Sequence, residues 1–311
     1  MSQQPPQGAY SDLSSLIALR FVAGQLKLER KKRALNQLAG PNKSNIRGRG
    51  IDFEEVRSYQ SGDDIRTIDW RVTARTGEAH TKLFREERER PVLIVTDQRN
   101  SLFFGSQHCF KSVLAANLTS LVAWSALNNG DRVGALIFSD QQHREIRPRR
   151  SRKTVLAILS EVVTCNRALP LALDSPSDNE RFADMLASLR RIVRPGSSLY
   201  LISDFAGANT ERAQEHLYQL AQHTELTAFA CTDPLEQQLP RAGLYAVTNG
   251  QARAQLSTGD KRTRQHFATA AKEAARDLQR GLRRLGIPLL NFSTCEAPLP
   301  LLQRYYGGGQ R

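Results

Sequence analysis

Short apolar runs alternate with longer stretches in which apolar residues recur every three or four positions, from residue 91 onward. The runs at 91–97 (PVLIVTD), 132–139 (RVGALIFS), 198–203 (SLYLIS) and 225–231 (ELTAFAC) are typical of buried parallel strands. Helical spacing follows these runs and predicts helices over about 107–128, 152–163, 180–193, 209–222 and 260–285. A weaker hairpin pattern covers 243–256, and a final strand covers 287–293. The alternation predicts an α/β fold with a doubly wound, mostly parallel sheet and helices on both faces.

The first 90 residues show a different pattern of apolar and charged positions. Residues 11–38 show an imperfect helical period with basic residues between the apolar ones, which predicts a basic amphipathic helix capped by Ser11 and stopped at Gly40-Pro41. A segment dense in Asp, Arg and Gly follows, with a strand expected at 79–84. We therefore divide the chain into a flexible N-terminus and helix (1–47), a segment packed on the sheet domain (48–90), the sheet domain (91–300) and a C-terminal tail (301–311).

The charge balance points to acidic or polyanionic partners. Lys and Arg number 44 against 31 acids, for a net charge of +13. Such an excess favours nucleic acid, an anionic membrane surface or an acidic protein face. Basic residues concentrate at 144–153 and along 261–284, but no stacking aromatics are interleaved with them as in an RNA-binding module. A solvated basic surface is the simpler interpretation, and nucleic-acid binding is the alternative.

The same sequence predicts a location in the cytoplasm. No apolar run approaches the roughly 18 residues of a membrane span, and no secretory signal is visible at the N-terminus. The four cysteines are scattered without a CxxC pair, which is typical of thiols in a reducing compartment.

Two of the predicted strands end in aspartate, at Asp97 and Asp204. Ligands of open α/β sheets bind beyond the carboxyl ends of the strands, so the two carboxylates are expected to converge there. With hydroxyls from Thr96, Ser101 or Ser203 they would suit Mg²⁺; alternatively, each caps a helix or closes a turn. No catalytic or phosphate-binding motif follows a strand, so we expect no enzyme, and a Mg²⁺-dependent phosphohydrolase built on Asp97 and Asp204 ranks last.

One block carries a recognisable motif. The residues between Gly48 and Arg75 spell G-x-G-x-x-F-x-x-x-R-x-Y-x-x-G-D-D-x-R-x-I-D-W-x-x-x-A-R and precede the strand that ends in Asp97. This pattern resembles the bacterial "domain of unknown function 58" family. The resemblance implies a von Willebrand factor A-like domain with strand order 3-2-1-4-5-6, and a gene typically found beside one for a MoxR-type AAA+ ATPase. It therefore favours a non-enzymatic scaffold or adaptor that works with such an ATPase and its client.

The resemblance also implies a metal-ion-dependent adhesion site. Its D-x-S-x-S motif and distal Asp would place Asp97, Ser101 and Asp204 around a Mg²⁺ ion. Arg99 stands where the motif has a hydroxyl, and we expect its fixed charge to pair with Asp97 or Asp204 and to take the place of the cation. No clear Thr occurs at 166–184, where Ser175, Ser177 and Asp178 are the substitutes. The site is thus expected to be degenerate, with no required cofactor.

Two surfaces are candidates for partner binding. The 62–75 block is either a recognition surface or an internal network of paired charges with Trp70 as a buried anchor. The basic 144–153 segment is expected to be a turn at the same sheet edge as Asp97. The residues proposed to contact a partner are Asp63, Asp64, Arg66, Asp69, Arg75, Arg99, Arg149 and Arg150.

Overall fold

The computed structural model describes residues 4–28, 52–60, 63, 65, 68–85, 91–169, 180–248 and 253–307. The chain forms two compact units. The sheet unit comprises residues 1–45 and 91–311, and the hairpin unit comprises residues 46–90. Asp64, Arg66, Ser175, Ser177 and Asp178 lie outside the described residues.

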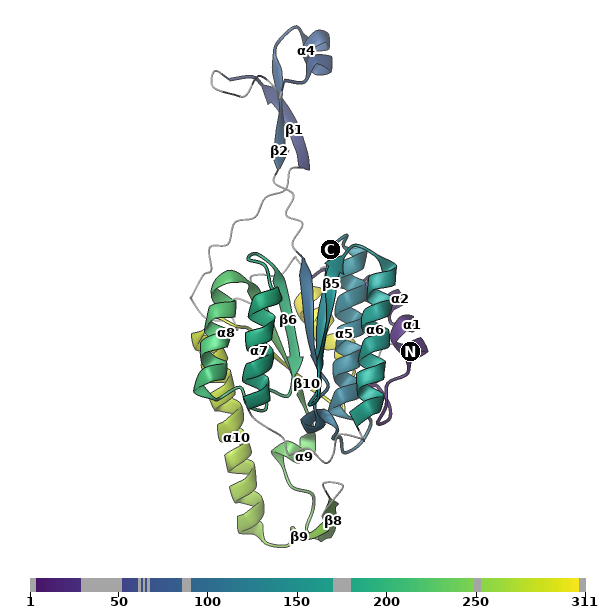
Figure 1. The fold of residues 1–311 in the computed structure, drawn as a ribbon, viewed down its shortest axis with the longest axis vertical. Helices are drawn as coiled ribbons and strands as arrows, with labels where there is room; N and C mark the ends of the chain where they lie inside the picture. The colour runs from purple at the N-terminus through teal and green to yellow at the C-terminus, as the bar shows by residue number, and fades with distance from the viewer. Residues whose placement is uncertain are drawn as a thin grey trace. The chain divides into compact units, whose positions relative to one another are not determined.

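A six-stranded sheet forms the centre of the sheet unit (Figure 1). Its spatial order is β10-β7-β6-β3-β4-β5, and all neighbours are parallel except β4 and β5. Numbered along the chain, this is the expected order 3-2-1-4-5-6. The predicted fold class is therefore confirmed. The strands are β3 (Val92–Asp97), β4 (Val133–Phe138), β5 (His143–Arg149), β6 (Ser198–Ser203), β7 (Glu225–Thr232) and β10 (Leu289–Ser293).

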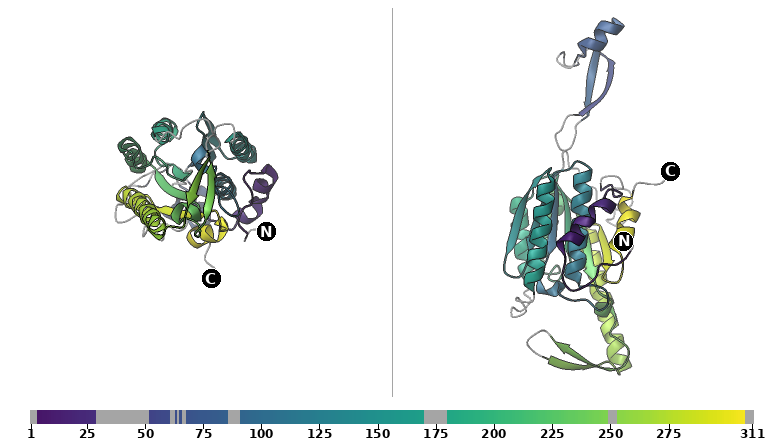
Figure 2. Two further views of the ribbon diagram at one scale, coloured as in Figure 1. Left: turned by 90° about the horizontal axis from the view of Figure 1, so that it is seen from below. Right: turned by 90° about the vertical axis from the view of Figure 1, so that its right-hand side faces the viewer.

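Helices cover both faces of this sheet (Figure 2). One hydrophobic core joins the sheet to α1 (Leu13–Ala18), α2 (Arg20–Ala23), α5 (Lys111–Asn128), α6 (Arg152–Ala168) and α11 (Pro298–Tyr306). A second core joins the opposite face to α7 (Glu180–Ile192), α8 (Glu211–His223) and the end of α10 (Lys261–Arg284). Because α5 lies between the sheet and other helices, it is buried on nearly every side.

The structure differs from the sequence prediction at both ends of the chain. The described part of the helix expected over 11–38 is two short helices, α1 and α2, and residues 24–28 are not helical. Asp12, not Ser11, caps α1, accepting a hydrogen bond from the backbone of Ser15. The expected tail at 301–311 is wrong in its first half, because α11 continues to Tyr306. Leu302 and Tyr306 are fully buried, so α11 is part of the core.

The basic 144–153 segment is a strand rather than a turn. β5 pairs antiparallel with β4, so that His143 lies opposite Phe138 and Arg149 opposite Val133. Phe138 is level with Asp97, whereas Val133 is level with Val92 at the start of β3. Arg149 and Arg150 therefore lie at the sheet edge opposite to Asp97, and their predicted place at the ligand edge is wrong.

An arm extends from the carboxyl edge of the sheet (Figures 1 and 2). It consists of α9 (Pro234–Gln237), the antiparallel pair β8 (Leu244–Thr248) and β9 (Arg253–Ser257), and the first half of α10. Within α10, Leu282 in the last turn is the buried residue. No helix among the described residues is long and apolar enough to cross a membrane.

The hairpin unit contains β1 (Asp52–Ser58) and β2 (His80–Arg85), paired antiparallel, and α4 (Trp70–Thr76) between them. Asp69 caps α4, and Gly77 ends it in the left-handed region at φ 78°, where glycine is favoured. Trp70 is 68% exposed, so it is not a buried anchor within the hairpin unit. The packing of residues 48–90 on the sheet domain stays a prediction.

Candidate functional site

The carboxyl ends of β3 and β6 bring Asp97 and Asp204 to one edge of the sheet. The two strands are parallel neighbours, with Thr96 opposite Ile202. The chain crosses from β3 to β4 on one side and returns to β6 on the other, so this edge is the switch point at which ligands of such sheets bind. Asp97 is fully buried.

Arg99 fills the space between these two carboxylates. Its Nε lies 3.1 Å from both Asp97 oxygens, and its Nη2 lies 2.8 Å from Oδ2. The same Nη2 lies 3.6 Å from Asp204 Oδ1 and donates to the Ala206 carbonyl at 3.1 Å. The pairing expected from the mismatch in the motif is present, and it is a bidentate ion pair with 4% of Arg99 exposed.

Aromatic rings and the backbone hold this guanidinium in place. The rings of Phe138 and Phe182 lie 5.5 and 5.3 Å from its central carbon, within the range of cation–π attraction. Ser203 Oγ donates to Asp97 Oδ2 at 2.6 Å and accepts from the backbone of Phe205 at 2.9 Å. Phe205 has a φ of 60°, an unusual conformation for a bulky residue, held by its neighbours.

A second buried cation, Lys111, completes the cluster and was missed by the sequence analysis. Its Nζ donates to Asp204 Oδ2 at 3.0 Å and to Glu236 Oε1 at 2.5 Å, and 2% of Lys111 is exposed. The sequence did contain a signal for this pairing. Lys111 is the first residue of a largely apolar helix, and a lysine is rarely buried unless it is paired. We call Asp97, Arg99, Lys111 and Asp204 the buried charge cluster.

The charge states follow from this pairing. Burial would lower the pKa of Lys111 and of Arg99, but Asp204 and Asp97 outweigh it and raise both pKa values. Burial would raise the pKa of Asp204, but Lys111 and Arg99 hold that pKa below its usual value. For Asp97, burial raises the pKa against the opposing effect of Arg99. Two cations therefore face two buried carboxylates, and Lys111 also contacts the partly exposed Glu236.

The cluster does not fit a divalent cation. In the implied adhesion site, a metal ion would be bound between Asp97 and Asp204, where the guanidinium of Arg99 and the ammonium of Lys111 make their contacts. Ser101, the third implied ligand, lies in a short 3-10 turn, Asn100–Leu102. The described residues also contain no group of three His, Cys, Asp or Glu side chains able to hold a metal.

The predicted partner-binding residues of the hairpin unit are in part engaged internally. Asp63 pairs with Arg57 at 2.8 Å and accepts from the backbone of Gln60 at 3.0 Å. Both contacts, the backbone one foremost, lower the pKa of Asp63. Asp69 accepts from the backbone of Arg71 and Val72 as the cap of α4. Arg75, in the last turn of α4, is exposed.

Two solved structures are similar to this chain. The VWA domain of SpRpn10 is 12% identical, with a TM-score of 0.35, and matches 71% of this chain and 98% of its own. An aerotolerance-related membrane protein from Bacteroides fragilis is 13% identical, with a TM-score of 0.39, and matches 70% of this chain and 98% of its own. The sheet order itself is that of a doubly wound α/β domain of the predicted class, and at its carboxyl edge an arginine lies between two carboxylates.

The sequence places the chain more narrowly. The family model "Protein of unknown function DUF58" matches residues 55–277, and the chain belongs to this family. "Uncharacterized protein Rv1480" of Mycobacterium tuberculosis is 30% identical over 288 residues, which cover 92% of this chain and 88% of that protein. The resemblance drawn from the Gly-Asp-Asp and Ile-Asp-Trp motifs is thereby confirmed.

Proposed function

We propose that this protein is a non-enzymatic interaction scaffold whose A-type domain binds other proteins without a bridging metal ion. The observation that carries the proposal is the bidentate pair between Arg99 and Asp97. In the adhesion site that the resemblance implies, a Mg²⁺ ion would lie between Asp97 and Asp204. Here the cation is a side chain of the protein, and both of its carboxylates are already neutralised.

The energetics of the cluster support a permanent, metal-free state. A divalent ion would have to displace the Arg99 guanidinium, which has four hydrogen bonds to Asp97 and Ala206 through Nε and Nη2. Breaking one partner of a buried ion pair costs about 3–5 kcal/mol, because an uncompensated charge is left behind.

The same contacts argue against catalysis at this edge. A phosphohydrolase would need Asp97 or Asp204 to hold a metal or to attack the substrate. Asp97 is instead fully buried, and Asp204 accepts from Lys111 and from the backbone of Ala206.

Family membership supports the choice of partner. The resemblance implies a gene beside that of a MoxR-type AAA+ ATPase, and the proposed role is to connect such an ATPase with its client protein. The candidate contacts are those of the hairpin unit, where Trp70 and Ile65 are 68% and 65% exposed. Exposed tryptophan and nearby arginine are the residue types that dominate the binding energy of protein interfaces.

Binding of the purified, nucleotide-free ATPase to the immobilised full chain tests the proposal. We expect the same affinity in Mg²⁺ and in EDTA, and a large loss of affinity for Trp70→Ala. Absence of binding contradicts the ATPase partnership, and binding that EDTA abolishes contradicts the metal-free mode. Hydrolysis of a phosphate monoester that is lost in Asp97→Ala contradicts the non-enzymatic assignment.

A further inference from the structure

Helix α10 has the largest net charge of the described helices and strands. This helix has 24 residues and is about 36 Å long. It contains eight basic side chains, Lys or Arg, and two carboxylates, Glu273 and Asp277. A net charge of +6 therefore lies on one helix of a chain whose total is +13.

The basic residues are sorted to one side of the helix. At 100° per residue, an arc of about 100° contains six cations and three neutral hydrogen-bonding side chains and no carboxylate. All nine residues are exposed. They form the α10 basic stripe: Lys261, Arg262, Gln265, Thr269, Lys272, Arg276, Gln279, Arg280 and Arg283.

The apolar side of α10 is turned the other way. Leu282 is fully buried, and Leu278 packs against the second core. Phe267 and Ala271 continue this side and are partly covered. The last turns of the helix thus keep their leucines toward the protein, and the face that bears the basic residues is polar.

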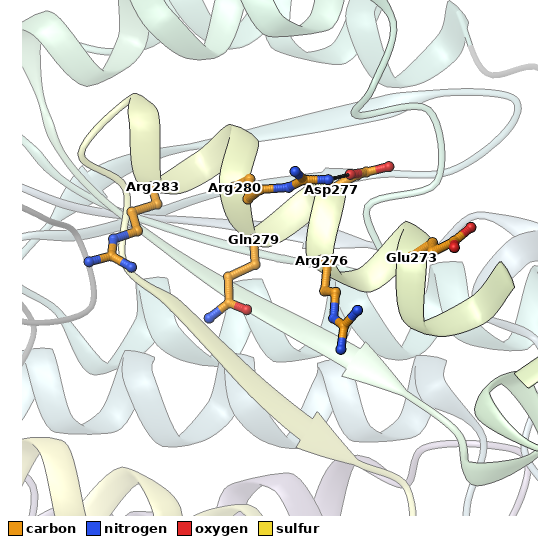
Figure 3. A pocket seen from close by; sticks show the side chains of 6 residues that line it. All are labelled: Glu273, Arg276, Asp277, Gln279, Arg280 and Arg283. Carbon is orange, nitrogen blue, oxygen red and sulfur yellow. Dashed lines mark hydrogen bonds and ion pairs between the residues drawn. The ribbon is translucent and has the colours of Figure 1, made fainter. Parts of the chain in front are cut away.

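The last turns of the stripe border a groove of about 570 Å³, which Glu273 and Asp277 also line (Figure 3). Arg276, Gln279 and Arg283 project from the same side of the helix, whereas Arg280 turns to Asp277 and pairs with it. Donors spaced three and four residues apart lie about 4.5 and 6 Å apart along the helix axis. They can therefore contact successive acceptors of an extended anion.

We propose that the α10 basic stripe binds the phosphate backbone of a nucleic acid, independently of base sequence. Arginine is the side chain best matched to phosphate oxygens, and the Thr hydroxyl and the Gln amide also donate hydrogen bonds to them. Phosphate contacts require no apolar groups, and the stripe has none. This inference does not depend on the proposed scaffold function.

Two other anionic partners fit this face less well. An amphipathic helix that binds a membrane inserts its apolar side, but the leucines on that side of α10, Leu278 and Leu282, pack on the second core. The centre of a protein interface is depleted in charged residues and rich in aromatic ones. The stripe shows the opposite composition.

Fluorescence anisotropy with a labelled DNA duplex of about 30 base pairs, roughly three helical turns, tests the proposal on the full chain. We expect the logarithm of the association constant to fall linearly with the logarithm of the salt concentration. The slope should be near −5 if all six cations contact phosphates. The variant Arg276→Glu/Arg280→Glu/Arg283→Glu should weaken binding at least about tenfold at 50 mM salt and reduce the slope by about 3. These side chains are exposed, so the melting temperature should stay close to wild type.

A matched control separates this surface from the net charge. Arg147→Glu/Arg149→Glu/Arg150→Glu changes the charge equally on and beside β5, and should keep the wild-type slope. Equal losses in both variants, or no duplex binding by the wild type, overturn the proposal. Poly-glutamate and vesicles of anionic lipid are tested as competitors at the same total charge as unlabelled duplex. If either competes as strongly as the duplex, the proposal is overturned, because the face would then recognise a protein or a membrane.

Discussion

Arg99 and Asp97, two residues apart at the end of β3, form a bidentate ion pair, and the Arg99 backbone also donates to Asp97 at 2.9 Å. One short segment thus supplies both the buried anion and its counter-ion. The pair needs no third component to be neutral.

Replacing this arginine should create a need for metal. Arg99→Ser restores the serine of the D-x-S-x-S motif and leaves Asp97 and Asp204 without their shared cation. We expect a loss of about 3–5 kcal/mol of unfolding free energy, measured by urea denaturation. Millimolar Mn²⁺ or Mg²⁺ should recover part of it in the variant and leave the wild type unchanged.

The double variant Arg99→Ser/Asp204→Ala is the control for this experiment. With one carboxylate removed, the metal should no longer stabilise the protein. A rise in the wild-type melting temperature on addition of Mg²⁺ would show that the arginine does not replace the ion.

Lys111 should be as important for stability as Arg99. Lys111→Met keeps the length of the side chain but removes the ammonium from Asp204, which keeps only Arg99 at 3.6 Å, and from Glu236, so we expect a loss of about 3–5 kcal/mol. Adding Asp204→Asn to this variant should restore part of the loss, because the uncompensated buried charge is removed. Chemical denaturation of the two variants measures the difference; equal stability of both would contradict the ion-pair account.

Asp233 should make stability depend on acid pH. Burial would raise its pKa, but Thr294, Ser106 and the backbone of Leu235 donate to it and hold the pKa below its usual value. Because the folded-state pKa is depressed, this stabilisation is full above the unfolded pKa of about 3.9 and is lost as pH falls through the folded value.

The comparison with Asp233→Ala isolates this effect. The variant should be less stable by about 3 kcal/mol at pH 7, and the difference should shrink as the pH is lowered toward 3. Urea denaturation across this range is the measurement. A difference that does not change with pH would mean that the carboxylate charge is unimportant.

Trp70→Ala should cost little stability. Since 68% of Trp70 is exposed, we expect less than about 1 kcal/mol, not the 3–5 kcal/mol of a buried aromatic. Leu302→Ala, in the buried part of α11, serves as the comparison and should cost about 2–5 kcal/mol. Thermal unfolding distinguishes the two, and a large loss for Trp70→Ala would place this side chain in a core.

The sequence predicted the parts of the fold that have strong periodicity. The run at 91–97 became β3, and the helix expected at 180–193 became α7. It did not predict β5, because charged residues and Pro148 hide the alternation, and proline in a strand is typical of edges only.

Among the site residues, the pairing of Arg99 followed from the local motif. Lys111 could not be paired from sequence, because Asp204 and Glu236 are 93 and 125 residues away and meet it only in the folded sheet.

β5 also bears on how copies of this protein behave at high concentration. An outer strand can template aggregation by accepting a strand from another molecule. Pro148 lacks the amide proton for such pairing, and Arg144, Arg147 and Arg149 would place like charges together in a joined sheet. β5 is thus an edge strand whose proline and arginines disfavour pairing with a strand of another molecule, and with it the growth of fibres from this side of the sheet.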